Sequence, residues 1–220
     1  MLSAVFKAFQ DLFSLELRSV LLKALGLTVL LFAGVLMATE IALLLLTQFS
    51  WPWADFVLGI GTGIVLVVAF FFLMPPVLAA FAGLFLDHVA ARVEARHYPG
   101  DPPGVPLGTA KALLMALQFF AIVLAVNLAV LPVVFFGIGA VALVGANAYL
   151  LSREYFEMAA MRHMPPADAR SLRRDNGVAV FVAGLVPALL ALVPIVNFLV
   201  PLYSTSYFVH LFKSVRASSA

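Results

Sequence analysis

An apolar run near the C-terminus constrains the fold more than any other feature. Residues 178–212 contain no Asp, Glu, Lys or Arg, and Pro187, Pro194 and Pro201 recur there at intervals of seven. As one continuous α-helix, rising ~1.5 Å per residue, the run would extend ~52 Å. Two complete passes through a ~30 Å hydrocarbon core need ~60 Å before any turn. The run therefore predicts a helical hairpin that turns between Pro194 and Asn197 and leaves the membrane by the face it entered.

The composition places the whole chain in a membrane. Of its 220 residues, 64% are hydrophobic and 11% are charged, whereas soluble domains carry roughly 25% charged residues. A formal net charge of +2, with no basic stripe interleaved with aromatic residues, excludes a nucleic-acid partner. The absence of cysteine excludes disulfides, thiolate catalysis and cysteine-based metal sites.

Periodicity and length divide the chain, which we treat as a single membrane domain over residues 1–220. The expected segments are an amphipathic helix over 3–17, a first span over 19–50, a second span over 56–97 that extends into the cytoplasm, a hairpin over 110–150, a cytoplasmic segment over 153–175 and the hairpin over 178–212. These patterns predict an all-α integral membrane protein. The stretch over 110–150 has room for two spans or for a hairpin, and the sequence leaves both open.

The charges predict the orientation in the membrane. All 13 Lys and Arg residues lie in the first 23 residues, in residues 92–111, in residues 153–174 or in the last eight residues. If the first two spans cross once each and each later stretch returns to its starting face, all four groups share one side. By the positive-inside rule that side is the cytoplasm, where both termini then lie. The outer face would carry only a short turn, which excludes a receptor ectodomain.

The sequence carries no pattern typical of an enzyme. It has no HExxH motif, no nucleophile elbow and no glycine-rich phosphate loop. Glu94 and His97 have a Glu-x-x-His spacing, but it occurs once, whereas di-metal helical bundles use it in pairs. A solvated helix face explains that pair, and His88, His163 and His210 form no metal-ligand pattern of their own. We therefore expect no enzymatic activity, no metal and no cofactor.

The most suggestive cationic stretch is SLELRSVLLKAL, residues 14–25, where the amphipathic helix gives way to the first span. A helix beginning there would present backbone N–H groups at the membrane surface, and Arg18 could donate two hydrogen bonds to an oxyanion. That is the outline of an anion site. The alternative, in which Arg18 and Lys23 extend to lipid phosphates, is favoured by the local sequence taken alone.

Three stretches together resemble the CysZ-type sulfate permeases of bacterial inner membranes. They are LELRSVLLKAL at 15–25, PPVLAAFAGLFLDHVAARVEAR at 75–96, and the C-terminal unit from SREYFEMAAMRHMPPADARSLRRDNG at 152 to GLVPALLALVPIVNFLVPLY at 203. The resemblance implies two long transmembrane helices, two hairpins that penetrate only part of the bilayer, and an N-terminal amphipathic helix. It also implies assembly as a homo-oligomer in contact with membrane lipid, and sulfate uptake that supplies cysteine biosynthesis.

The family's sulfate-binding motif is a Gly, an aliphatic residue and one or two Arg residues. Carried onto this chain, the aliphatic position falls on Leu17 and the first Arg on Arg18. Glu16 stands where the Gly would be, and Ser19 stands where a second Arg can occur. A carboxylate beside the oxyanion is repulsive, so these departures predict a weaker or displaced sulfate site.

The family's pore entrance, a network of acidic residues and an Arg after the second long helix, falls on Asp87 and Arg92, with Glu94 nearby. Ala90 stands where a second acid is expected. The resemblance thus implies an ion entrance at Asp87, Arg92 and Glu94, with an incomplete network.

The function implied by the resemblance is sulfate uptake across the bacterial inner membrane by a channel-like permease. A desolvated dianion is very unfavourable in low dielectric, so its path must be wet or lined by hydrogen-bond donors. Asn197, Ser204 and Thr205 of the C-terminal run are the expected donors. The alternative is a non-transporting membrane scaffold of the same wider family, which the imperfect anion motif leaves open.

Overall fold

The structure, a computed structural model, describes residues 2–46, 56–57, 59–68, 85–106, 108 and 139–219, with helical pieces at 114–115, 117–119, 121–122, 125–126 and 129. The regular structure in these residues is entirely α-helical, as the sequence predicts. The helices are α1 (Leu2–Leu12), α2 (Leu15–Leu46), α4 (Leu86–His97), α6 (Gly139–Met161), α7 (Pro166–Asp175), α8 (Gly177–Leu190), α9 (Pro194–Asn197) and α10 (Val200–Ser219). The turn expected at 51–55 and much of the stretches over 56–97 and 110–150 lie outside the described residues.

The amphipathic helix ends earlier than the sequence predicts. Helix α1 stops at Leu12 rather than at residue 17, and the amide of Ser14 donates to the carbonyl of Asp11 at 2.9 Å. Ser14 then starts α2, because its hydroxyl accepts the Leu17 amide at 3.4 Å and its carbonyl accepts the Arg18 amide at 3.1 Å. Serine is a favoured residue at helix starts for this reason. Leu17 and Arg18 therefore belong to the first turn of the long helix.

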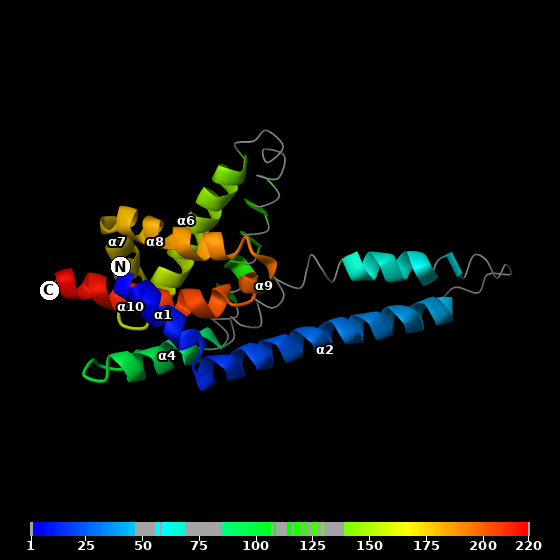
Figure 1. The fold of residues 1–220 in the computed structure, drawn as a ribbon, viewed down its shortest axis with the longest axis horizontal. Helices are drawn as coiled ribbons and strands as arrows, with labels where there is room; N and C mark the ends of the chain where they lie inside the picture. Colours follow the sequence, from blue (N-terminus) through cyan, green and yellow to red (C-terminus); the bar gives the residue numbers. More distant parts are fainter. Residues whose placement is uncertain are drawn as a thin grey trace.

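Helix α2 is the first predicted span. Within the described residues, its section Leu15–Ala42 is the helix long and apolar enough to cross a membrane. Figure 1 shows α2 projecting from the compact body formed by the other labelled helices, with the shorter apolar helix Gly59–Val68 extending from the same side. Large side chains such as Leu30, Met37 and Leu45 are exposed along α2. A surface of this kind suits lipid or another protein in the membrane.

The C-terminal run folds back on itself where the prolines and Asn197 predict. Helix α8 ends at Leu190, the short α9 follows at Pro194–Asn197, and α10 leads the chain back to the side from which α8 came (Figure 1). In that view α9 lies well short of the far end of α2. The geometry is that of a helical hairpin shorter than the long helix beside it.

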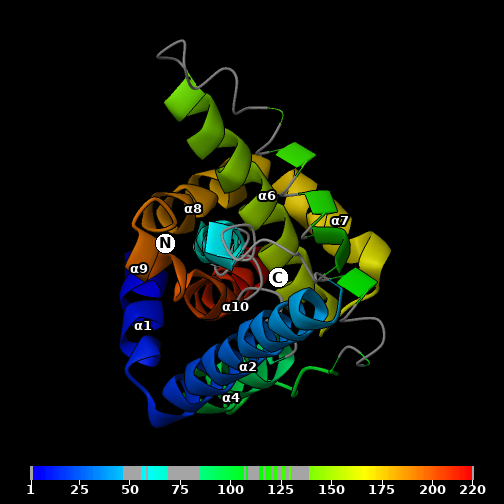
Figure 2. The same ribbon diagram turned by 90° about the vertical axis from the view of Figure 1, so that its right-hand side faces the viewer.

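Helix α10 forms the centre of the body. Figure 2 shows α1, α4, α6 and α8 arranged around it, and each of these helices contacts it. Its aromatic side chains fill the core: Tyr207 and Phe208 are buried, and Phe212 packs edge-on against Phe156 of α6 with ring centroids 6.2 Å apart. Such pairs add stability beyond the apolar area that they bury.

Helices α6 and α8 approach each other closely enough to require glycine. A Cβ atom at Gly184 would meet the backbone carbonyl of Ala148 and lie 2.7 Å from the Cβ of Ser152. Small residues at such a crossing let two helices pack backbone to backbone. Helix α6 is also continuous from Gly139 to Met161, so no break separates the predicted segments over 110–150 and 153–175.

Candidate functional site

A buried arginine organises an ionic cluster in the body. The side chain of Arg162, in the turn directly after α6, is 0% exposed. Its Nη1 atom lies 2.7 Å from Asp87 Oδ1, and its Nε and Nη2 atoms donate to the two carboxylate oxygens of Glu94, each at 3.2 Å. The fork of the guanidinium therefore binds Glu94 with two hydrogen bonds and Asp87 with a third, which fixes α6 against α4.

The Glu94 carboxylate has further partners. The Nε2 atom of His163 lies 2.8 Å from Glu94 Oε1, and the Gly104 amide donates to Oε2 at 3.2 Å. Burial alone would raise the pKa of Glu94, but the hydrogen bonds from Arg162 and His163 outweigh it and hold the pKa below its ordinary value. The Val105 amide donates to the Arg162 carbonyl at 2.8 Å, so the loop after α4 covers the cluster.

This cluster corrects the predicted network of Asp87, Arg92 and Glu94. The structure brings Asp87 and Glu94 together, but on Arg162 rather than on Arg92, which is exposed. Asp87 and Glu94 are seven residues apart and therefore share one face of α4. Arg92 lies between them in the sequence, and its position directs its side chain away from that face. Sequence reasoning missed Arg162 because its partners lie 68 and 75 residues away. The local signal was an Arg-His pair directly after a helix of mostly apolar and small residues.

The start of α2 presents the predicted sulfate-binding residues in an open setting. Leu17 is buried, while Glu16, Arg18 and Ser19 are exposed. The guanidinium of Arg18 lies 6.0 Å from the ring centroid of Phe13, and the Ser19 hydroxyl donates to the Glu16 carbonyl at 2.7 Å. The amides of Leu17 and Arg18 already bond to Ser14, so the Arg18 side chain is the group of this motif that is available to an anion.

A cleft of about 300 Å³ joins the two predicted sites. It lies where α2 begins against α4, and its lining residues are Asp11, Ser14, Glu16, Leu17, Arg92, Val93, Ala95 and Arg96. Glu16 and Leu17 of the sulfate motif and Arg92, assigned from the sequence to separate sites, therefore border one space, whereas Arg18 and Ser19 are not among its lining residues. Arg92 and Arg96 are both exposed, so two guanidinium groups border the cleft beside the start of α2.

The model of the family described as Sulfate transporter CysZ/Etoposide-induced protein 2.4 matches residues 4–201. The chain belongs to this family. No curated protein matches it. The matched range contains most of α1, the start of α2, all of α4 and Arg162, so the cluster and the cleft both lie inside it. The family is transporter-like rather than enzymatic, and together with the apolar helix α2 it supports a membrane protein with a role like that of a sulfate transporter.

The expected pathway donors lie in the C-terminal hairpin of this family member. Asn197 is partly buried in α9, and its backbone N–H donates to the Val193 carbonyl at 2.8 Å. Ser204 and Thr205 are 0% exposed in α10, inside the body. The Thr205 hydroxyl donates to the Pro201 carbonyl at 2.8 Å, whereas the Ser204 and Tyr203 hydroxyls have no hydrogen-bond partner among the described residues. Ser204 is therefore a better donor candidate than Thr205.

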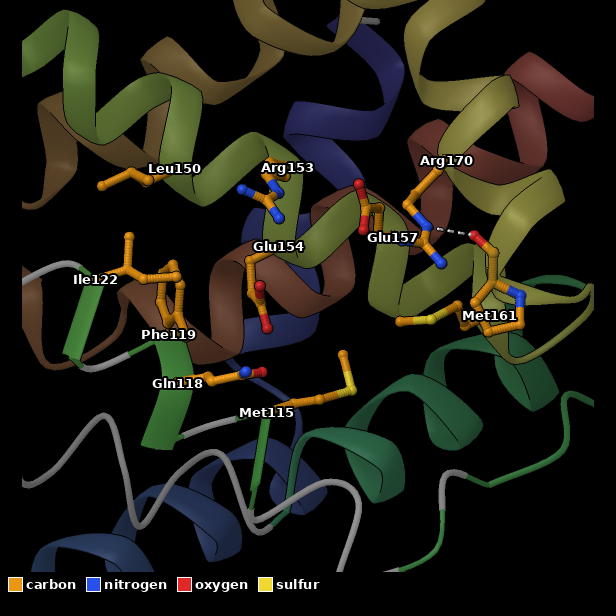
Figure 3. A pocket seen from close by; sticks show the side chains of 11 residues that line it. Met115, Gln118, Phe119, Ile122, Leu150, Arg153, Glu154, Glu157, Met161 and Arg170 are labelled. Atoms are coloured by element: carbon orange, nitrogen blue, oxygen red, sulfur yellow. Dashed lines mark hydrogen bonds between the residues drawn. The ribbon is translucent and has the colours of Figure 1, made fainter.

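A second pocket, of about 290 Å³, was not predicted (Figure 3). Its lining residues are Met115, Gln118, Phe119, Ile122, Leu150, Arg153, Glu154, Glu157, Met161, Pro166 and Arg170. Glu154 of α6 points toward Gln118 across this pocket. Burial and the nearby charge of Glu157 raise the pKa of Glu154 to about 7, while Glu157 itself pairs with Arg173 at 2.7 Å. No local sequence signal indicates the pocket, because three separate segments form it.

Proposed function

We propose that this protein is a channel-like permease for sulfate in the bacterial inner membrane, which supplies sulfate for cysteine biosynthesis. The observation that carries the proposal is the cleft at the start of α2. There Glu16 and Leu17 of the family-type motif line the cleft in the first turn of a helix long enough to span, next to Arg92 and Arg96 of α4, and Arg18 is exposed in the same turn. A divalent oxyanion is the class of ligand that such a group of guanidinium side chains attracts.

The charges at the cleft favour weak, reversible capture. Glu16 is exposed at the rim and opposes an anion, while the Asp11 carboxylate is buried and bonded to His97 and Ser206 at 2.9 and 2.6 Å. Exposed charge pairs contribute only ~0–1 kcal/mol. A conducting site must bind strongly enough to admit the ion and weakly enough to release it. A cleft built from exposed arginines meets both demands.

The path beyond the cleft follows the hairpin α8–α10. A sulfate dianion needs water or donors at every depth, and the buried hydroxyls of Tyr203 and Ser204, which have no partner within the described part of the chain, are donors of that kind. The hairpin then enters the bilayer part-way, both termini are cytoplasmic, and the exposed apolar side chains of α2 contact lipid and further copies of the chain. The protein works as a homo-oligomer whose copies together bound the path.

Uptake of radiolabelled sulfate into proteoliposomes tests the function. We expect the wild type to take up sulfate and Arg18→Ala to reduce uptake, with expression and oligomer size unchanged. Lys23→Ala is the matched control, because Lys23 is an exposed cation on the same helix beyond the motif. Equal loss in both variants would assign Arg18 to lipid contact.

The second candidate function is a non-transporting membrane scaffold, which the carboxylate of Glu16 at the motif's glycine position favours. Absence of uptake by the wild type, in vesicles where a known channel conducts, would support it. Glu16→Gly separates the candidates further. A permease with this site should bind sulfate more tightly once the repulsive carboxylate is removed, and calorimetry measures that change.

A further inference from the structure

Three side chains from distant parts of the sequence meet between α1, α4 and α10. They are Asp11 near the end of α1, His97 at the end of α4 and His210 in α10, and their ligand atoms all lie within 4.8 Å of one another. Asp11 Oδ1 is 2.9 Å from His97 Nε2, and Asp11 Oδ2 is 3.2 Å from His210 Nε2. Asp11 and His210 are each 2% exposed. A buried carboxylate with two imidazoles directed at it is a preformed ligand set.

We propose that Asp11, His97 and His210 bind a divalent transition-metal ion of the Zn²⁺ class, which fastens α1 to α4 and α10. Imidazole nitrogen and carboxylate oxygen ligands lie ~2.0–2.2 Å from Zn²⁺ in tetrahedral sites, which separates neighbouring ligand atoms by about 3.3 Å. The oxygen-to-nitrogen distances of 2.9 and 3.2 Å are close to that spacing. Imidazole ligands favour Zn²⁺, Co²⁺, Ni²⁺ or Cu²⁺ over Mg²⁺ and Ca²⁺, which prefer oxygen.

The surrounding groups are those that orient metal ligands. The Tyr98 hydroxyl lies 2.8 Å from His210 Nδ1, and the Ser206 hydroxyl donates to Asp11 Oδ2 at 2.6 Å. If Nδ1–H of His210 donates to Tyr98, the lone pair of Nε2 faces the Asp11 carboxylate and is free to bind a metal. Metal-bound histidines have their second ring nitrogen held by such a partner.

The competing arrangement is a hydrogen-bonded cluster without a metal, which requires the other tautomer of His210. In that case His210 Nε2–H donates to Asp11 and Nδ1 accepts from the Tyr98 hydroxyl.

Nearby cations oppose a metal: an Arg96 Nη1 lies 3.7 Å from Asp11 Oδ1, and the Lys7 and Lys213 ammonium groups lie 5.9 and 5.5 Å from the Tyr98 ring centroid. The Arg96 side chain is 57% exposed and can turn into solvent, so it does not block the site.

Cobalt titration of the full, tag-free protein in detergent tests the proposal. The chain has no cysteine, so the visible absorption of bound Co²⁺ reports nitrogen and oxygen ligands. We expect saturable binding of one Co²⁺ per chain, displaced by Zn²⁺ and not by Mg²⁺. His97→Gln should weaken binding at least about 100-fold, because even loss of an outer partner weakens metal sites 10–100-fold. Its amide can still donate to Asp11, which preserves the fold.

The matched control is His88→Gln, since His88 is an exposed histidine of the same helix outside the cluster. It should bind Co²⁺ as the wild type does, and Tyr98→Phe should bind about tenfold more weakly. Zn²⁺ should also raise the melting temperature of the wild type and of His88→Gln, but not that of His97→Gln. No saturable binding by the wild type, or equal affinities for His97→Gln and His88→Gln, would leave a hydrogen-bonded cluster and overturn the metal site. None of these measurements depends on sulfate transport.

Discussion

The Nε and Nη2 atoms of Arg162 each lie 3.2 Å from one carboxylate oxygen of Glu94, and both side chains are buried. The pair joins the end of α6 to α4, on the helix that continues the second predicted span. The same guanidinium holds Asp87 at 2.7 Å. The cluster thereby fixes the distance between α6 and α4. The opposite side of α4 borders the cleft at the start of α2.

Replacing Arg162 should be among the most destabilising single changes in the body. Arg162→Met leaves the Glu94 and Asp87 carboxylates without their shared cation, and breaking a buried pair in this way costs about 3–5 kcal/mol. We expect a markedly lower melting temperature in detergent. Arg92→Met, which removes an exposed arginine from α4, should change stability by less than about 0.5 kcal/mol. Similar melting temperatures for the two variants would show that the cluster contributes little.

Glu154 predicts a pH dependence of stability. Its pKa in the folded protein is about 7, above the ordinary value of 4.5. The folded state therefore retains a proton that the unfolded chain has lost, and the contribution of Glu154 to stability falls as pH rises from 4.5 to about 7. We expect Glu154→Gln to match the wild type near pH 4.5 and to be more stable than it at pH 8, measured by thermal unfolding. A difference in stability between the two proteins that stays the same at every pH would contradict the raised pKa of Glu154.

Gly184 should not tolerate a side chain. Gly184→Ala places a methyl group 2.7 Å from the Cβ of Ser152 and against the carbonyl of Ala148, so α6 and α8 must separate. Overpacking of this kind costs about 1–3 kcal/mol. Gly145→Ala, at a helical glycine where an added Cβ would have nothing within 4 Å, should be neutral or stabilising by up to about 1 kcal/mol. Equal changes in stability for Gly184→Ala and Gly145→Ala would mean that α6 and α8 can move apart at little cost.

Cysteine labelling tests the depth of the hairpin, and the native chain lacks cysteine. A membrane-impermeant maleimide added from the periplasmic side should react with Ala54→Cys and not with Val196→Cys. Ser214→Cys, at an exposed position of α10, should react only when the cytoplasmic face is opened. Strong periplasmic labelling of Val196→Cys, comparable to that of Ala54→Cys, would show a complete span and remove the proposed pathway.

Local patterns were sufficient for the long helix α2 and for the reversal of the chain between α8 and α10. The hairpin and its turn followed from the length of an uncharged run with spaced prolines, and the first span followed from continuous apolar composition. Both are properties of neighbouring residues, because a helix satisfies its backbone hydrogen bonds within its own segment. The ends of helices were less well predicted: the amphipathic helix α1 ends at Leu12, before its apolar stripe does, and α6 continues through the change from apolar to charged residues near Arg153.

The sequence by itself determined that the chain is helical, apolar enough for a membrane and reversed near Asn197, and it assigned Asp87 and Glu94 to one charged network. Only the tertiary structure decided which cation joins those carboxylates, that Arg92 borders the cleft at the start of α2, and that Asp11 meets His210 across 199 residues. The reason is that helical periodicity fixes the face on which a residue lies but not the helix that packs against that face. A buried charge must be paired, and it pairs with the opposite charge that helix packing brings beside it. The number of residues between the two along the chain does not predict how close they lie in space.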